Sequence, residues 1–420
     1  MLEHESALSD TLLRQLMAVG QVDILVGLPT LNNAATVTDV VRAVHVAFNR
    51  DFPRLRTVLI NSDGGSTDGT PELVRAATLT ESDMVQTSHS LRTLHRVLSP
   101  YHGLPGKHTA LRAVFAAAEL TQATALVVLD PGGPATTPER VTELIHPIVK
   151  GEIEFLAPRY RRHPRDGVLI TQLVRPFVRA VYGVGLDEPL GAEFACSGRF
   201  ASHCLEQDIW NHEAARFAID LWLRTEAVAT QFSIAQIWRP ASSATGLRAT
   251  LRETVQQIVL SLAECLRAHQ TFWTAATGLV ELHTLGSDIG AIPEPPKWDV
   301  ESLAAQARQD LLAISPVLTE VLDRDTVNRV VEDISRDEWT VDGELWVGIV
   351  SAFAAAMRRS RGGREHLAAM FVPLYLWRAA AFMARTAPEQ PTTVQQRLDG
   401  LCETFLRLKP ALVSRWSAEV

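Results

Sequence analysis

The sequence predicts an α/β fold with a largely parallel sheet in its first half, followed by an α-helical C-terminal region. In the first 246 residues, short apolar runs alternate with segments whose apolar positions repeat at helical spacing, which is typical of a sheet with helices on its faces. Polar loops follow three of the apolar runs. The pattern turns helical beyond about Gly246, and no strand pattern is present from Asp299 onward.

The predicted strands are short and apolar. They span residues 23–29, 56–61 and 123–130. A helix is expected after the first of them, because one helical stripe carries Val37, Val40, Val41, Val44 and Phe48. The second strand leads into a polar loop and a helix that starts near Pro71, with Thr70 in the N-cap position. A further helix is expected after the glycine-rich stretch 103–108.

The proline-rich stretch I-P-E-P-P-K-W, residues 292–298, is interpreted as a linker. The expected division is therefore an α/β domain at 1–246, a helical extension at 247–292 and a helical domain at 293–420. The apolar tract at 367–384 contains Pro373 and Arg378. It is interpreted as a buried helix, because a membrane span needs about 20 residues almost free of charge.

Composition favours a soluble globular protein. The chain has 420 residues, 46% hydrophobic and 21% charged, and a net charge of −8, which argues against a general nucleic-acid surface. The cysteines are too few and too scattered for a disulfide framework or a CxxC metal site, and reduced thiols in a cytoplasm are the simplest interpretation. They are Cys196, Cys204, Cys265 and Cys402. The N-terminal residues lack the pattern of a signal peptide.

Three polar loops, at residues 29–33, 63–70 and 130–133, are expected at the carboxyl ends of parallel strands, where ligands bind in such sheets. Asp63, in D-G-G-S-T-D-G-T, could accept from a base N–H or a ribose hydroxyl, or the loop could satisfy its own hydrogen bonds. Gly106 and Lys107 precede a helix that could lie beside these loops, and they could hold a diphosphate, although for so short a motif taken alone an exposed lysine in a turn is the favoured interpretation. Asp130, in V-V-L-D-P-G-G-P, is suited to bind Mg²⁺ or Mn²⁺ or to form only a turn.

Other charged residues stand in apolar or basic surroundings. Glu193 and Asp220 lie within apolar stretches, and such carboxylates either have shifted pKa values that serve chemistry or are paired structurally. Arg159 opens the basic cluster R-Y-R-R-H-P-R, which could grip an anionic substrate or form a solvated face.

In combination, four motifs resemble the GT-A-fold, family-2-like glycosyltransferases: V-G-L-P-T-L-N-N, D-G-G-S-T-D-G-T, G-K-H-x-A-L-R and V-V-L-D. Three more resemble the retaining branch of mannosylglycerate synthase and glucosyl-3-phosphoglycerate synthase: A-P-R-Y-x-R-H-x-x-D-G, E-P-L-G-A-E-F and F-A-I-D. The resemblance covers nearly the whole chain and is weak in the helical region.

This resemblance implies transfer of a hexose from a UDP- or GDP-linked sugar to a small, glycerate-like hydroxyl acceptor, with retention. It would place Pro29, Thr30 and Asp63 at the base and ribose, and Gly106 and Lys107 at the diphosphate. Further implied site residues are Asp130 at the ribose and metal, Arg159 at the substrate, and Glu193 and Asp220 near the sugar and acceptor.

Two departures affect the metal. The family's second DxD carboxylate is Gly132 here, and Trp238 and Arg239 stand in the stretch where the family has a histidine ligand. Weak or no metal dependence is therefore expected, with Asp130 as the ligand if Mg²⁺ or Mn²⁺ is used. Lys107, His108 or Arg239 would then stabilise the leaving diphosphate.

Two classes of function remain open from the sequence. One is an active glycosyltransferase, and the other is an inactive pseudo-glycosyltransferase that regulates or assembles with a partner. A homodimer through the C-terminal helices and a monomer that packs them internally both fit the sequence.

Overall fold

The chain folds into two units, which are described separately. A computed structural model describes residues 8, 10–84, 95–100, 107–133, 135–211, 213–240, 251–287, 292–336, 342–360 and 362–418. The sheet unit consists of Met1–Arg159, Gly191–Ser242 and His283–Ser287, and the helical unit consists of Tyr160–Leu190, Ser243–Leu282 and Asp288–Val420.

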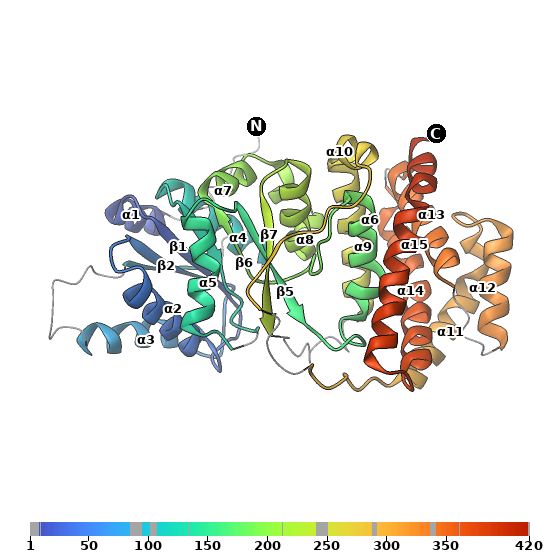
Figure 1. Cartoon of the computed structure of the whole chain (residues 1–420), viewed down its shortest axis with the longest axis horizontal. Helices are drawn as coiled ribbons and strands as arrows, with labels where there is room; N and C mark the ends of the chain where they lie inside the picture. The colour runs from blue at the N-terminus through green and yellow to red at the C-terminus, as the bar shows by residue number, and fades with distance from the viewer. Residues whose placement is uncertain are drawn as a thin grey trace. The chain divides into compact units, whose positions relative to one another are not determined.

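The sheet has eight strands in the order β3-β2-β1-β4-β6-β5-β7-β8 (Figure 1). Strand β1 is parallel to both β2 and β4, whereas β6 is antiparallel to β4 and β5. The strands are β1 Ile24–Thr30, β2 Thr57–Asp63, β3 His95–Pro100, β4 Ala125–Val128, β5 Phe155–Arg161, β6 Phe194–Ser197, β7 Ile234–Pro240 and β8 Thr284–Leu285.

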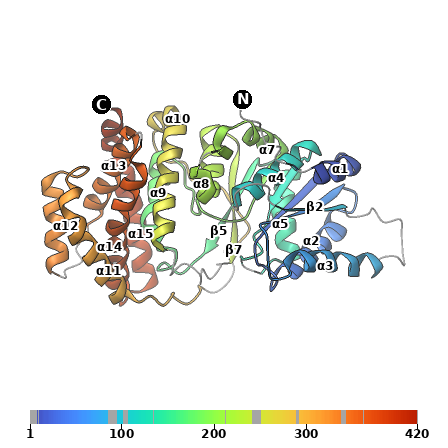
Figure 2. The same cartoon turned by 180° about the vertical axis from the view of Figure 1, so that it is seen from behind.

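Helices cover both faces of this sheet. Ile24, Val26 and Leu28 of β1 join one buried cluster with side chains of α2 and α5, and α4 packs on the opposite face (Figures 1 and 2). A Cβ added at Gly27 would lie 2.5 Å from Val114 Cγ1, so α4 approaches β1 at a position that only glycine fits. The helices are α1 Asp10–Val19, α2 Val37–Asp51, α3 Thr70–Met84, α4 Lys107–Leu120, α5 Pro138–Val149, α7 Gly198–Leu205, a 3₁₀ turn Asp208–Asn211 and α8 Glu213–Ala229.

The helical unit is built around buried aromatic and aliphatic side chains. Its elements are a π-helical turn Ile170–Val174, α6 Arg175–Tyr182, α9 Leu251–Ala268, α10 Gln270–Ala275, α11 Val300–Leu318, α12 Arg324–Arg336, α13 Gly343–Arg359, α14 Arg364–Thr386 and α15 Pro391–Ser417. The buried Lys409 donates to the carbonyls of Val181, at 2.7 Å, and Ala276, at 2.5 Å. This ammonium therefore satisfies carbonyls at the C-terminal ends of α6 and α10.

Helix α14 is both long and apolar. By length and composition alone it could cross a membrane, but 78% of its most apolar window is buried within the protein. The buried helix predicted at 367–384 is therefore confirmed. Arg378, in the middle of α14, donates to Gln172 Oε1 at 3.0 Å, which satisfies part of its hydrogen-bonding capacity inside the helical unit.

The predicted fold class is confirmed: a mostly parallel sheet with interleaved helices precedes a helical C-terminal region. Residues 292–298 lie outside helices and strands, and α11 begins after Asp299, whose carboxylate accepts from the Ser302 backbone N–H at 3.1 Å. The two units divide the chain differently from the expected boundaries. Residues 160–190 belong to the helical unit, and residues 283–287 return to the sheet unit because β8 pairs with β7.

Candidate functional site

Polar side chains gather at the carboxyl edge of the sheet. Thr30 and Asp63 are register partners at the ends of β1 and β2, and Asp130 follows β4, the other neighbour of β1. This is the edge at which open α/β sheets bind ligands. Pro29, half-buried in β1, precedes Thr30.

The loops after β1 and β2 are joined by hydrogen bonds. Asp63 accepts from the backbone N–H groups of Gly65 at 3.0 Å and Ser66 at 2.8 Å, and from the Ser66 hydroxyl at 2.6 Å. The Thr30 hydroxyl lies 2.9 Å from Asp63 Oδ1. Four further bonds link the loops: Asn32 N to Ser66 Oγ, Asn33 N to Thr70 Oγ1, Ala34 N to Asp68 Oδ2, and Thr67 N to Asn32 Oδ1. This arrangement corresponds to the alternative in which the loop satisfies its own hydrogen bonds. A ligand would therefore share the Asp63 carboxylate with the partners that it already has.

Lys107 and Asp220 form an ion pair across 113 residues of sequence. Lys107 is the first residue of α4, and its Nζ lies 2.8 Å and 2.7 Å from the two carboxylate oxygens of Asp220 in α8. The same ammonium donates to the carbonyl of Ala192 at 3.1 Å. The side chains are 29% and 15% exposed, so the pair is partly desolvated and still within reach of a ligand. Asp220 follows a helix interruption at Ala218.

Arg239 of β7 is enclosed by protein groups. Its guanidinium donates to Glu193 Oε1 at 3.1 Å and Glu143 Oε2 at 2.8 Å, and to the carbonyls of Arg140 and Trp238. The Arg239 side chain is only 2% exposed. In this arrangement the guanidinium is already neutralised, so the expected role on a leaving diphosphate is revised: Arg239 holds Glu193.

Glu193 is a carboxyl of the candidate site with little exposure to solvent. Burial raises the pKa of Glu193 above its ordinary value, the positive charge of Arg239 opposes this, and the negative charge of Asp130 adds to it. Val128 of β4 pairs with Phe194 of β6, so Asp130 and Glu193 stand just beyond the ends of two neighbouring strands. Glu193 also follows Ala192, whose carbonyl accepts from Lys107. Lys107, Asp220, Glu193, Asp130 and Arg239 therefore belong to one neighbourhood.

The segment after Asp130 is a turn closed by its own hydrogen bonds. Asp130 Oδ1 accepts from the Gly132 N–H at 3.0 Å, and the Asp130 carbonyl accepts from the Gly133 N–H at 3.0 Å. No group of three or more His, Cys, Asp or Glu side chains that could hold a metal occurs among the described residues. With Glu193 committed to Arg239, this donor set does not fit a divalent cation that the protein holds by its own side chains.

The remaining predicted residues are placed as follows. The Arg159 guanidinium lies over the Trp238 ring at 4.4 Å from its centroid and donates to Thr284 Oγ1 at 3.3 Å. His108 is buried, with Nε2 at 3.2 Å from Thr109 Oγ1. Gly106 lies outside the described residues.

The rest of the basic cluster is not a solvated face. Within the helical unit, Arg162 donates to Glu188 at 2.8 Å and pairs with Asp166 at 3.4 Å, and its side chain is only 16% exposed. The ion pair with the buried Glu188 keeps the Arg162 guanidinium largely out of water. A count of charges along the sequence does not reveal this pair.

Glu143 and the Ala192 carbonyl were missed by sequence reasoning. Glu143 lies on α5, where a charged residue in an amphipathic helix normally indicates a solvated face, and its side chain is indeed 54% exposed. The carbonyl of Ala192 carries no side-chain signal.

Gly132→Asp is expected to create a Mn²⁺ site that Gly132→Asn does not. A Cβ at position 132 would lie 3.4 Å from Asp130 Oδ1 and 3.7 Å from Asn33 Nδ2, both ordinary contacts. A second carboxylate can therefore be added beside Asp130, and cation affinity rises with ligand charge. Calorimetry with Mn²⁺ should show binding at least about tenfold tighter than in the parent protein. Equal gains in both variants would contradict the carboxylate explanation.

No protein-family model matches the sequence, and no curated protein matches it. Several solved structures resemble the fold. Glucosyl-3-phosphoglycerate synthase from Mycobacterium tuberculosis, in complex with phosphoglyceric acid, is 21% identical over 64% of this chain and 86% of that chain, with a TM-score of 0.43. Its complex with Mn²⁺, UDP and glucosyl-3-phosphoglycerate is 21% identical over 62% and 86%, with a TM-score of 0.42. Mannosyl-3-phosphoglycerate synthase from Rubrobacter xylanophilus is 18% identical over 61% and 78%, with a TM-score of 0.42. These enzymes are of the kind that the sequence motifs resemble.

Proposed function

We propose that the protein is a glycosyltransferase that moves a hexose from a UDP- or GDP-linked sugar to a small, glycerate-like hydroxyl acceptor. The observation that carries this proposal is the Lys107–Asp220 pair at the carboxyl edge of the sheet, next to Ala192 and Glu193. The pair supplies an ammonium for a diphosphate and a carboxylate for a hydroxyl. Binding of these two groups would separate Lys107 from Asp220. Retention of configuration is proposed on the motif resemblance alone.

Lys107 would stabilise the charge that develops on the leaving diphosphate, because a positioned ammonium in a partly dry site is effective at that task. When a phosphate of the donor binds the Lys107 ammonium, Asp220 loses its ion-pair partner. The free carboxylate can then accept a hydrogen bond from a hydroxyl of the sugar or acceptor. Arg239 would act by positioning Glu193 rather than by touching the substrate.

The other site residues would bind the donor. Thr30 and Pro29 would line the base and ribose, and Asp63 would keep its loop hydrogen bonds while accepting from the nucleotide with a remaining lone pair. Asp130 would contact the ribose, and Arg159, stacked on Trp238, would contact the substrate. Gly106 would lie at the diphosphate.

We infer weak or no dependence on a divalent cation. Asp130, whose Oδ1 already accepts from the Gly132 N–H, is the carboxylate that the described turn offers, and Mg²⁺ or Mn²⁺ would depend on substrate oxygens for most of its ligands. The charge on the diphosphate would be carried by Lys107.

Calorimetric titration with UDP, GDP and their sugars, in Mn²⁺ and again in EDTA, tests the donor site. Saturable binding of one nucleotide in EDTA is the expected result. Binding that requires Mn²⁺ would overturn the metal-free site while keeping the nucleotide site. Absence of binding to every nucleotide would overturn the donor site altogether.

A pseudo-glycosyltransferase is the second candidate. The enclosed Arg239 guanidinium and the self-satisfied Asp63 loop favour it, because both leave less capacity for a ligand. It would act as a regulatory or assembly partner. For either function we propose a soluble, cytoplasmic protein, with a homodimer through the C-terminal helices as one arrangement.

A further inference from the structure

Arg224 of α8 is a buried cation of the sheet unit, only 1% exposed. Its guanidinium donates to three main-chain carbonyl oxygens. Nη1 donates to Asp220 at 2.9 Å, and Nη2 donates to Gly191 at 2.6 Å and to Glu193 at 3.1 Å. Because the guanidinium is planar and carries five N–H donors in a fixed arrangement, it can hold several acceptors in one geometry. Arg224 therefore joins the segment before β6 to the turn of α8 that carries Asp220.

The segment Gly191–Glu193 lies between two cations. It is outside helices and strands, and its first and third carbonyls accept from Arg224. The carbonyl between them, that of Ala192, accepts from the Lys107 ammonium at 3.1 Å. Planar peptide units are joined only through φ and ψ, so fixing the carbonyls on both sides restricts the direction of the middle one. Arg224 thereby orients the Ala192 carbonyl toward Lys107.

Close packing holds the guanidinium in this position. A Cβ added at Gly191 would lie 2.6 Å from Pro158 Cγ and 3.1 Å from Arg224 Nη2, so the segment approaches both groups more closely than a side chain would allow. The guanidinium carbon lies 5.8 Å from the Phe155 ring centroid and 6.0 Å from that of Phe194. These neighbours leave Arg224 little freedom to turn away from its three acceptors.

We propose that Arg224 is a positioning residue for hexose transfer, an inference that rests on the function proposed above. Arg224 holds the Ala192 carbonyl and Asp220 in place around the Lys107 ammonium without touching the substrate. When the donor's phosphate displaces the Asp220 carboxylate, the Ala192 carbonyl stays on Lys107 and keeps the ammonium directed at the diphosphate. Such placement matters because a displacement of about 1 Å in a catalytic site can cost about 10²-fold in rate.

Titration calorimetry on the full chain with UDP and GDP tests this role. Arg224→Met should weaken binding of the nucleotide that the parent protein binds by at least about tenfold, the effect of losing one charge-assisted hydrogen bond to the diphosphate. Methionine occupies part of the same space but cannot donate to the three carbonyls, so Lys107 would lose its oriented acceptor.

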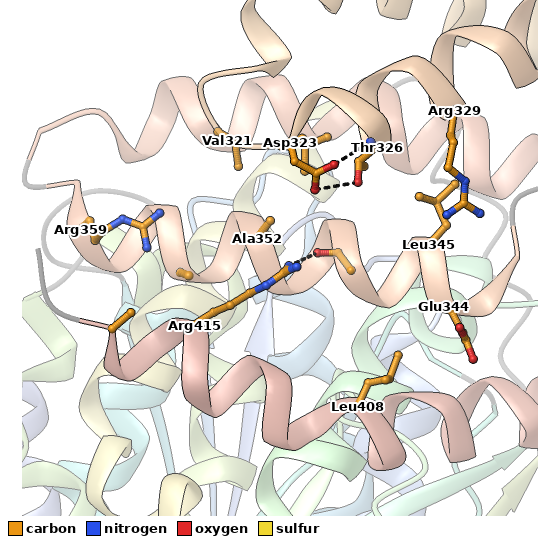
Figure 3. Close-up of a pocket in the computed structure, with 14 residues that line it drawn as sticks. Val321, Asp323, Thr326, Arg329, Glu344, Leu345, Ala352, Arg359, Leu408 and Arg415 are labelled. Carbon is orange, nitrogen blue, oxygen red and sulfur yellow. Dashed lines mark hydrogen bonds between the residues drawn. The ribbon is translucent and has the colours of Figure 1, made fainter.

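Two matched variants should bind the nucleotide as the parent protein does. Val44→Ala loosens the core of the sheet unit in the cluster of α2 and α5, whereas Arg224 lies on α8, which packs on α4. Arg415→Met removes an exposed arginine of the helical unit that also donates to a main-chain carbonyl, that of Gly348, at 3.0 Å (Figure 3). The first controls for a weakened core and the second for the loss of a positive charge.

Gly191→Ala tests the same placement without removing a charge. The added methyl group cannot fit between Pro158 and Arg224 unless the segment moves, so nucleotide binding should again weaken about tenfold. The double variant, with Arg224→Met, should bind at most about threefold more weakly than the weaker single variant, because both substitutions act through one segment. Thermal unfolding scans establish that each variant is folded, and Gly191→Ala keeps the proposal testable if Arg224→Met is not.

The outcomes separate this inference from the proposed function. Absence of UDP and GDP binding in the parent protein would overturn the proposed function and this inference with it. Parental binding that Arg224→Met and Gly191→Ala leave intact would overturn this inference alone. An equal loss in Val44→Ala would also overturn it, since the loss would then reflect a loosened core, and so would fully additive losses in the double variant.

Discussion

Replacing Lys107 with methionine is expected to lower kcat/KM for hexose transfer about 10²–10³-fold, the usual effect of removing one charge-stabilising donor from a transition state. Methionine keeps an unbranched chain of similar length but removes the ammonium that lies between Asp220 and the Ala192 carbonyl. Initial-rate assays with the nucleotide sugar that binds best would measure the effect, and calorimetry would report the loss of diphosphate affinity independently of turnover.

Two variants make that result interpretable. Lys150→Met removes a lysine whose side chain is 56% exposed and 4.0 Å from Glu152, and it should leave kcat/KM unchanged. Asp220→Asn keeps Lys107 but weakens its competing partner, so nucleotide affinity should rise while kcat falls. A Lys107→Met protein that retains parental kcat/KM and nucleotide affinity would remove Lys107 from the donor site.

Arg239→Met is expected to cost about 3–5 kcal/mol of unfolding free energy, because it leaves a buried charge without its partner. The Glu193 side chain is 12% exposed, whereas Glu143, at 54%, can return to water. Equilibrium unfolding in urea, followed by circular dichroism, would measure the loss. Adding Glu193→Gln to Arg239→Met should recover a large part of it.

The same loss should depend on pH. Without Arg239, the folded-state pKa of Glu193 is expected to lie further above the ordinary glutamate value of 4.5. The folded protein then binds the proton more tightly than the unfolded chain does. Stability is therefore greatest below the unfolded pKa and declines as pH rises through the folded pKa. Arg239→Met should be less destabilising at pH 5 than at pH 8, and a pH-independent loss of less than about 1 kcal/mol would contradict the paired-charge account.

Much of the sheet unit was predictable because its signals are local. The apolar runs that became β1, β2 and β4 end at polar residues, and the helices between them have clear apolar stripes. The antiparallel β6 was not predictable, since four residues carry too little pattern and its position between β4 and β5 depends on distant partners. The assignment of residues 160–190 to the helical unit is likewise a matter of non-local packing.

The sequence indicates which polar residues stand at the strand ends, but not which of them pair with one another. Strand ends place Asp63 and Asp130 at one edge, because parallel strands share a direction. Nothing local indicates that Lys107 meets Asp220. Arg239 illustrates the limit most clearly. Its position in the sequence suggested that it binds an anion, the leaving diphosphate. In the structure it instead contacts two acidic residues, one from α5 and one from the segment before β6.

The sheet unit is assembled from three separate stretches of chain. The residues between them, 160–190 and 243–282, belong to the helical unit. During synthesis the sheet therefore stays incomplete until β8, at Thr284–Leu285, has been translated. A fragment ending at 246 would leave β7 without β8, as a bare edge that invites pairing with other chains. Because each unit is made of separate stretches of chain, a single cut releases neither of them intact.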